Sequence, residues 1–84
     1  MPEVGALHDL GMPRLGVAMQ EGTVLRWLKA EGEAVAQDEL LLVIENDKVE
    51  IEVPSPWAGT LDQRLASEGD VVPVLQTIAR IREA

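Results

Sequence analysis

The chain contains no cysteine among its 84 residues. This absence excludes disulfide bridges, zinc-thiolate sites and thiol nucleophiles, and it makes the fold indifferent to the redox state of its compartment. Histidine is almost as scarce, since His8 is the only one. Because His8 has no cysteine, serine or metal-ligating partner at a useful spacing, we expect it on the surface or on an edge strand. We predict neither a catalytic residue nor a metal site.

Aromatic side chains and positive charge are also scarce. Phenylalanine and tyrosine are absent, and the two tryptophans are Trp27 and Trp57. Fifteen acidic residues against seven basic ones give a net charge of −8. Such a chain repels phosphate backbones and anionic lipid surfaces, and it lacks stacking platforms for single-stranded nucleic acid. We therefore expect no nucleic acid and no membrane as partner. The acidic surface suits either solubility or docking onto basic patches of other proteins.

Long apolar runs are missing as well. The longest, residues 40–44 and 71–75, are too short to span a bilayer, and Glu3 and Asp9 do not fit a signal peptide. We expect a protein of the bacterial cytoplasm, or of the mitochondrial matrix if the source is eukaryotic; the cytoplasm is favoured because no transit peptide is visible. The length fits one small domain, which we expect to be monomeric.

The sequence contains an internal repeat. Sliding the chain along itself places Gly22-Thr23 on Gly59-Thr60 and the segment 31–33 on 68–70, and apolar positions keep the same register beyond them. Two copies are too few for a solenoid, so the repeat predicts one domain with internal pseudo-twofold symmetry. Before the repeat begins, the first half carries four extra residues, somewhere in the segment 14–21.

Short strands are predicted rather than helices, although the segment 25–42 is rich in good helix formers. Glycine in the middle of that segment and regularly spaced prolines favour strands and turns. The clearest signal is the alternation of apolar residues over 40–53, which is typical of a β-hairpin. A two-residue loop at Asp47-Lys48 would pair Ile44 with Ile51 and place six apolar side chains on one buried face. These are Leu40, Leu42, Ile44, Val49, Ile51 and Val53.

Lys48 is thus predicted at the exposed tip of this hairpin. Four carboxylates surround it in sequence, Glu45, Asp47, Glu50 and Glu52, and the register sets Glu45 directly opposite Glu50. Like charges at such positions mildly destabilise a hairpin. The cluster fits either a solvated hairpin end or a recognition surface around one nucleophilic amine.

Several motifs together resemble one known family. The segment 44–49, Ile-Glu-Asn-Asp-Lys-Val, followed by Glu-Val-Pro at 52–54 and Ala-Gly-Thr-Leu at 58–61, resembles the lysine-attachment region of biotinyl/lipoyl domains. Met-Pro-Arg-Leu-Gly at 12–16, with the motifs of residues 21–32, is similar to lipoyl domains from the acyltransferase component of 2-oxo acid dehydrogenase complexes. The resemblance covers roughly residues 7–81. It departs at the tip, where the family often has Thr-Asp-Lys-Ala and this chain has Asn46-Asp47-Lys48-Val49.

This resemblance implies an all-β fold, a flattened barrel or sandwich of two four-stranded antiparallel sheets, one from each half of the chain. It implies lipoate bound covalently to Lys48 as N6-lipoyllysine, and a swinging arm that shuttles acyl groups and reducing equivalents. The implied partners are a lipoate ligase or lipoyl transferase, a thiamine-diphosphate-dependent 2-oxo acid decarboxylase, the acyltransferase catalytic core and dihydrolipoamide dehydrogenase. The second lysine, Lys29, is expected at a solvated strand end, which leaves Lys48 as the attachment residue.

Specificity is expected near the tip, where Asp47 has two interpretations, turn formation and recognition. The four-residue insertion is the second candidate, because in resembling domains this loop lies close to the lysine and helps the decarboxylase recognise its partner. Val17 and Met19 fit core positions equally well. The candidate recognition residues are Asp47, Glu45, Asn46, Val49, Glu50, Arg14, Val17, Ala18, Met19 and Gln20.

Two alternative functions remain open from the sequence. A biotin carboxyl carrier usually has methionine on both sides of its lysine, which Lys48 lacks; an unmodified barrel-sandwich interaction module is the other. The parent complex is also open, because residues 12–22 look pyruvate- or acetoin-like and residues 47–54 look closer to 2-oxoglutarate or branched-chain types. We expect a loose segment at 1–6, a domain over 7–82, and the start of a linker or tail at 83–84.

Overall fold

The computed structural model describes residues 5–84, and all regular structure in that range is β-strand. Most of the loose segment expected at 1–6 therefore lies outside the described residues. No helix in the described range is long and apolar enough to cross a membrane. The strands are β1 (Leu7–Gly11), β2 (Glu21–Trp27), β3 (Ala34–Val35), β4 (Leu40–Asn46), β5 (Val49–Pro54), β6 (Gly59–Arg64), β7 (Val71–Pro73) and β8 (Thr77–Glu83).

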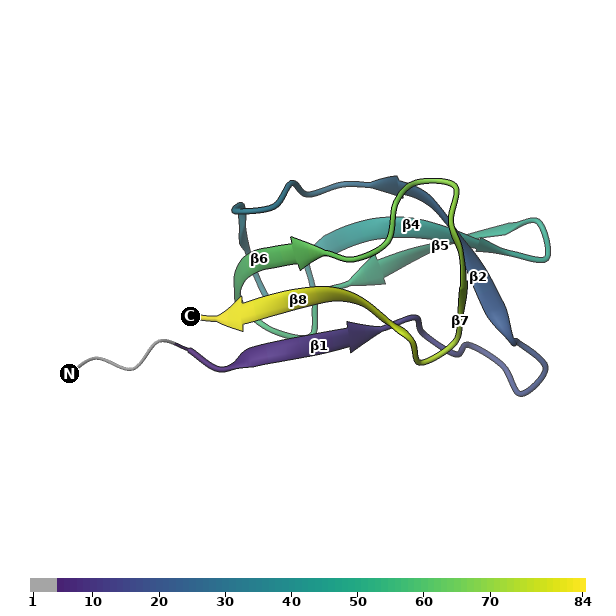
Figure 1. Ribbon diagram of the computed structural model, residues 1–84, viewed down its shortest axis with the longest axis horizontal. Helices are drawn as coiled ribbons and strands as arrows, with labels where there is room; N and C mark the ends of the chain where they lie inside the picture. The colour runs from purple at the N-terminus through teal and green to yellow at the C-terminus, as the bar shows by residue number, and fades with distance from the viewer. Residues whose placement is uncertain (1–4) are drawn as a thin grey trace.

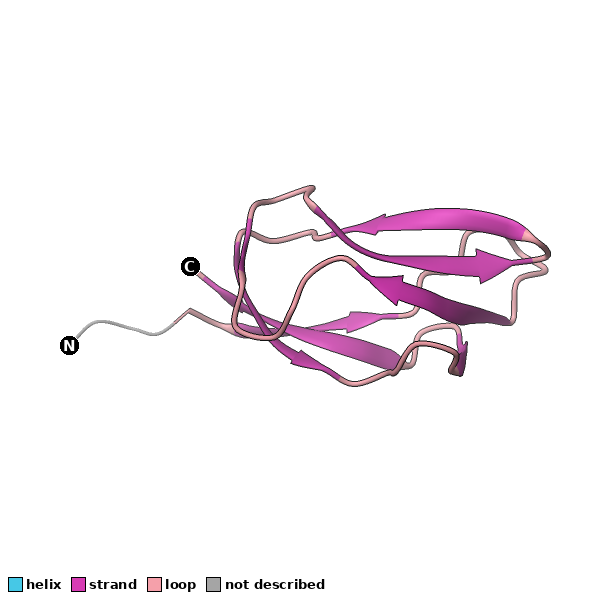
Figure 2. Cartoon of the chain, turned by 90° about the horizontal axis from the view of Figure 1, so that it is seen from above, coloured by secondary structure: helices cyan, strands magenta, loops and turns pink. Residues whose placement is uncertain are grey.

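Two antiparallel four-stranded sheets face each other, with strand orders β1-β8-β6-β3 and β5-β4-β2-β7 (Figures 1 and 2). The all-β class and the two sheets are as predicted, and strand pairing within residues 5–84 does not close them into a barrel. The expectation of one sheet from each half of the chain was wrong. Each sheet combines two strands from each half, because β1 pairs with β8 and β2 pairs with β7.

The pseudo-twofold symmetry predicted from the repeat is present in the strand order. Exchanging β1, β2, β3 and β4 for β5, β6, β7 and β8 converts one sheet into the other. The symmetry extends to the turns, because Gly32 and Gly69, which are equivalent in the repeat, both have positive φ, 89° and 94°. Glycine adopts this left-handed backbone conformation without the steric cost that a Cβ imposes on other residues. Gly22 and Gly59, which are also equivalent in the repeat, lie at the beginnings of β2 and β6.

The core lies between the two sheets and consists almost entirely of aliphatic side chains and methionine. Met12, Leu41, Ile44, Leu61 and Ile81 are each fully buried. A Cβ added at Gly22 would lie 2.9 Å from the Met12 sulfur, so Met12 would have to shift to accommodate it. Met12 and Met19 thus fill the interior beside β2, and they hold the segment between β1 and β2 against the body of the domain.

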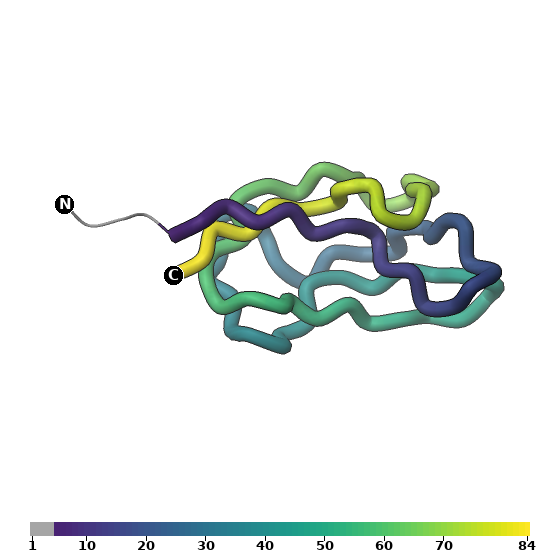
Figure 3. Tube along the Cα trace, turned by 90° about the horizontal axis from the view of Figure 1, so that it is seen from below, coloured from purple at the N-terminus to yellow at the C-terminus, as the bar shows by residue number. Residues whose placement is uncertain are grey.

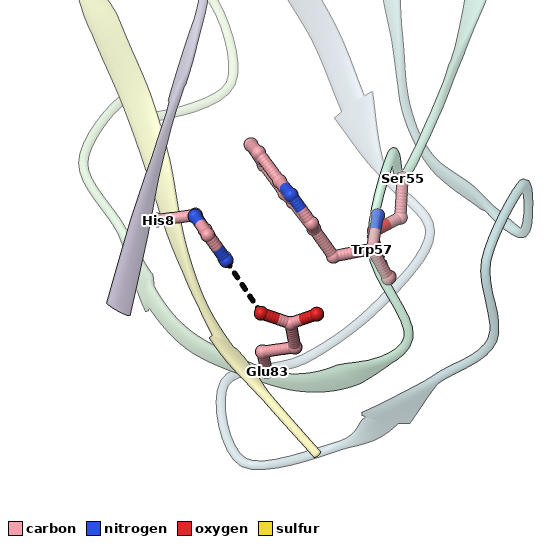
Figure 4. A network of polar contacts seen from close by, with 4 residues as sticks. All are labelled: His8, Ser55, Trp57 and Glu83. Atoms are coloured by element: carbon pink, nitrogen blue, oxygen red, sulfur yellow. Dashed lines mark hydrogen bonds and ion pairs between the residues drawn. The ribbon is translucent and has the colours of Figure 1, made fainter. Parts of the chain in front are cut away.

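The end of the sandwich where β1 begins and β8 ends is closed by an aromatic stack (Figure 4). The rings of His8 and Trp57 lie parallel, with centroids 4.3 Å apart, and His8 Nε2 is 2.8 Å from Glu83 Oε1. His8 is on an edge strand, as predicted, and Trp57 packs against the core. Strand β8 continues through Glu83, which the sequence had assigned to the outgoing segment.

Candidate lysine-presentation site

The β4–β5 hairpin has the register that the sequence predicts. Ile44 pairs with Ile51, Leu42 with Val53 and Asn46 with Val49, which leaves Asp47-Lys48 as a two-residue turn. The hairpin tip lies at the opposite end of the sandwich from the beginning of β1 and the end of β8 (Figure 1). Alternating apolar residues fix this register, because a one-residue slip would turn Ile44 and Val53 away from the core.

The turn itself adopts left-handed backbone at both central residues, with φ of 52° at Asp47 and 64° at Lys48. Positive φ at both positions is the signature of a type I′ turn, whose twist matches that of the flanking strands. Aspartate tolerates this conformation, whereas it is uncommon for lysine. The lysine therefore occupies a conformation that ordinary turn propensity does not favour, which points to a role for its side chain.

Lys48 is exposed, and within residues 5–84 no carboxylate forms an ion pair with its amine. The four carboxylates close to it in sequence thus leave the amine free. The prediction that six apolar side chains share one buried face was wrong at Val49, which is 58% exposed, and Leu40 is only half-buried. Burial along β5 falls from Val53 through Ile51 to Val49, because the opposite sheet does not cover the hairpin tip.

Lys29, unlike Lys48, is paired and mostly covered. The expectation that Lys29 is solvated was wrong. Its Nζ lies 2.7 Å from Glu39 Oε2, and the side chain is only 18% exposed. The hydrogen bond with Glu39 raises the pKa of Lys29 above its ordinary value, and the same bond lowers the pKa of Glu39. Lys29 is therefore held in an ion pair, so Lys48 is the accessible amine of the two.

The outer face of the hairpin carries the acidic residues. Glu45 lies directly opposite Glu50, as predicted, and Glu52 lies opposite Val43. Arg26 on β2 partly compensates, since its Nη2 is 3.9 Å from Glu50 Oε1. Both partners of this pair are largely exposed, so its contribution to stability is small.

The segment between β1 and β2, which contains the insertion, lies beside the hairpin tip (Figure 3). Together they form an open groove of about 470 Å³. Its lining consists of Leu15, Gly16, Val17, Ala18, Met19, Asn46, Asp47, Val49 and Ile51. The structure thus brings the two recognition candidates, the tip and the inserted loop, to one place.

The five candidate residues of the loop have different surroundings. Met19 is a core residue at 5% exposure, whereas Val17 is 92% exposed, so the core interpretation holds for Met19 and is wrong for Val17. Arg14 does not line the groove, because its guanidinium donates to the Val17 carbonyl oxygen at 2.8 Å. Ala18 and Gln20 line a second, polar depression next to Glu45.

The structure adds one residue that was not a candidate, Leu15, and gives the candidate Asn46 a structural contact that the sequence did not predict. Asn46 donates through Nδ2 to the Glu21 carbonyl oxygen at 3.1 Å, which fastens the hairpin to the end of the loop. Leu15 lines the groove and is 57% exposed. The sequence signal that could have identified Leu15 is a leucine within a predicted loop, and that signal is weak.

The site fits covalent attachment of a prosthetic group better than metal binding. Within the described range, no group of three or more His, Cys, Asp or Glu side chains is arranged to hold a metal ion. An amide bond to a carboxylic acid requires one accessible amine, which Lys48 supplies at the exposed tip. The residues present therefore fit a group such as lipoate.

Comparisons with known proteins agree with this arrangement. Residues 8–81 match the family model described as "Biotin-requiring enzyme". The chain is 51% identical over 80 residues to the dihydrolipoyllysine-residue acetyltransferase component of the pyruvate dehydrogenase complex of Corynebacterium glutamicum, covering 95% of this chain and 12% of that protein. It is 47% identical over 76 residues to the succinyltransferase component of the 2-oxoglutarate dehydrogenase complex of Cupriavidus necator, covering 90% and 18%.

A solved structure shows the same fold. The lipoyl domain of the 2-oxoglutarate dehydrogenase complex from Azotobacter vinelandii superimposes with a TM-score of 0.75 at 36% identity, and the match covers 90% of this chain and 96% of that one. The chain spans less than a fifth of the length of the two acyltransferase components named above. It belongs to the biotin- and lipoyl-attachment family, as a lipoyl domain homologous to those of acyltransferase components of 2-oxo acid dehydrogenase complexes.

Proposed function

We propose that Lys48 carries lipoate in an amide bond and that the loaded domain shuttles acyl groups and reducing equivalents within a 2-oxo acid dehydrogenase complex. The observation that carries the proposal is the contrast between the two lysines. Lys48 projects from a type I′ turn with a free amine, whereas Lys29 is paired with Glu39 at 2.7 Å. Lipoyl domains are carrier domains rather than catalysts on their own.

The domain's part in its own modification is presentation. A lysine amine is almost entirely protonated at neutral pH, so a lipoate ligase or lipoyl transferase must remove a proton before the nitrogen attacks the activated acid. The rigid hairpin holds Lys48 beyond the body of the domain, where an enzyme can surround it. The core-packed register of β4 and β5 fixes its position, which a flexible loop would not do.

When bound, lipoate supplies a dithiolane whose disulfide accepts an acyl group with reduction and is later restored by thiol-disulfide exchange. The proposed partners are a thiamine-diphosphate-dependent decarboxylase, the acyltransferase catalytic core and dihydrolipoamide dehydrogenase. The residues of this chain contribute position and accessibility to these encounters. Tethering makes each encounter intramolecular, with an effective concentration that reaches the millimolar range for short flexible links.

Recognition by these enzymes is assigned to the tip and the inserted loop. Asp47, Val49 and Glu50 are exposed around the lysine, and Glu45 and Asn46 are half-exposed beside them. Val17, Ala18 and Gln20 are accessible from the same side, whereas Met19 supports the loop from within and Arg14 braces it through the Val17 carbonyl. The acidic character of the tip favours enzymes whose entrance is basic.

The identity of the complex is tested by reductive acylation. The lipoylated domain is incubated separately with purified thiamine-diphosphate-dependent enzymes specific for pyruvate, acetoin, 2-oxoglutarate and branched-chain 2-oxo acids, each with its substrate, and its mass is measured. We expect one enzyme to add its acyl group much faster than the others. A domain that is lipoylated but acylated by none of them would contradict the carrier proposal, and efficient loading by a biotin ligase would favour the biotin carrier instead.

A further inference from the structure

The inner face of the hairpin tip is apolar and lacks a covering strand. Val49 belongs to the same face of β5 as Val53, which is buried in the core, yet Val49 is 58% exposed. Across the groove, Leu15 and Val17 are 57% and 92% exposed. The groove therefore continues the hydrophobic interior of the sandwich towards the hairpin tip, and the inserted loop lines its other side.

Exposed aliphatic side chains gather at this groove. Of the eight large hydrophobic residues that are exposed within residues 5–84, three line it. Single exposed aliphatic residues need no explanation, but an apolar groove with a buried floor marks a binding site. The floor is formed by Met19 and by Ile51, which packs against the core.

The two faces of the tip differ in charge. Glu45, Glu50 and Glu52 lie on the strands around the tip, but none of them lines the groove. The groove contains one charged residue, Asp47, at its edge. An occupant of this groove is therefore expected to be uncharged and largely apolar. Because the groove is open, a nearby tethered group can enter it without any rearrangement of the strands.

We propose that this groove seats the lipoyl arm of the same domain when the arm is not engaged by an enzyme. The inference rests on the proposed attachment at Lys48. That residue lies in sequence between Asp47 and Val49, both of which line the groove, so the arm begins at its rim. The amide linkage removes the lysine charge, and the acyl chain with its dithiolane is the uncharged apolar chain that the lining favours. Seating covers Leu15, Val17 and Val49.

Tethering makes even weak contacts sufficient for seating. A group attached at the rim has an effective concentration in the millimolar range, so a weak intrinsic affinity fills the groove for much of the time. The same weakness lets a docking enzyme withdraw the arm. The four-residue insertion has no counterpart in the second half of the chain, which has no attachment lysine to serve. Covering the arm explains why the symmetry is broken here.

Methyl NMR of the lipoylated and unmodified 84-residue chain tests the proposal. We expect lipoylation to shift the methyl signals of Leu15, Val17 and Val49, and to give NOEs between the arm and these methyls. The methyl signals of Val71 and Leu28, which are exposed outside the groove, should not move. Intact mass confirms loading in each sample, so a failure of attachment is distinguished from a failure of seating.

A matched pair of variants completes the test. Val17→Ser and Val71→Ser, the latter at an exposed valine elsewhere, are compared only as protein whose complete lipoylation is verified by intact mass. Val17→Ser should lose the arm-to-groove NOEs, and Val71→Ser should keep them. Fully lipoylated protein whose groove methyls resemble those of the unmodified chain would overturn the proposal. Groove shifts that appear without lipoylation as the protein concentration rises would indicate a second copy as occupant. Shifts that appear only on adding a decarboxylase would indicate that enzyme instead, and either result would also overturn it.

Discussion

Glu45 lies directly across the hairpin from Glu50, one pair removed from the turn that presents Lys48. Two carboxylates at facing positions repel each other, and the Arg26 guanidinium, 3.9 Å from Glu50, offsets this only in part. A stability cost retained beside the attachment lysine is understandable if the charges serve recognition.

Glu45→Gln is therefore expected to stabilise the domain by roughly 0.5 kcal/mol in urea unfolding. Glu52→Gln is the matched control, because Glu52 faces Val43 and its removal separates no directly facing pair of carboxylates. If the charges serve recognition, the stabilised Glu45→Gln variant is a poorer substrate for the decarboxylase. A variant that is less stable than the parent would contradict the repulsion argument.

Asp47 has two interpretations, turn formation and recognition, which different substitutions can separate. Its φ of 52° suits Asn and Gly as well as Asp, so Asp47→Asn and Asp47→Gly should leave the free energy of unfolding unchanged or slightly raised. Asp47→Val, with a branched side chain in left-handed backbone, should lose roughly 1–3 kcal/mol. If the carboxylate is also a recognition element, Asp47→Asn will be acylated more slowly despite its intact fold. Equal acylation rates would assign Asp47 to the turn alone.

The Lys29–Glu39 pair gives the domain a defined response to pH. Because the folded-state pKa of Glu39 is lowered from 4.5, its stabilising contribution is present above about pH 4.5 and is lost as the pH falls through the lowered value. The pKa of Lys29 is raised from 10.5, so its contribution is present below that pH and is lost as the pH rises through the raised value.

A double-mutant cycle with Glu39→Gln and Lys29→Gln measures this coupling. The coupling free energy, obtained from urea unfolding, should be constant between pH 6 and pH 9, within the window bounded by 4.5 and 10.5, and should decline towards zero in acid. A coupling that grows as the pH falls would have the wrong sign and would refute the assignment. Lipoylation of Lys48 should be the same in all four proteins.

Trp57 closes the opposite end of the sandwich, through its stack on His8 at 4.3 Å. The buried Ser55 hydroxyl holds the turn that carries it, donating to the Trp57 carbonyl oxygen at 2.6 Å. Trp57→Ala should lower the free energy of unfolding by roughly 3 kcal/mol, the lower end of the range for tryptophan, because the indole is only partly buried. Lipoylation below the melting temperature should be unaffected. A selective loss of lipoylation in folded protein would show that the two ends are coupled.

The features that the sequence predicted best depend on the alternation of apolar side chains and on residues close together along the chain. The pairing of Ile44 with Ile51 and the exposed turn at Lys48 follow from local pattern alone. The exposure of Val49 does not follow from local pattern, because it depends on where the opposite sheet ends. The exchange of strands between the halves was missed for a similar reason, since a repeat reveals symmetry but not which copies pair. The ion pair of Lys29 with Glu39 joins two turns that no local pattern connects.

The central claim is that Lys48 is the single attachment residue. Intact mass is measured for the parent chain, Lys48→Arg and Lys29→Arg, each co-expressed with lipoate ligase and supplied with lipoate. We expect the parent and Lys29→Arg to gain the mass of one lipoyl group, and Lys48→Arg to gain none while remaining folded by circular dichroism. A Lys48→Arg protein that still gains lipoate, or a parent chain that gains none, would contradict it.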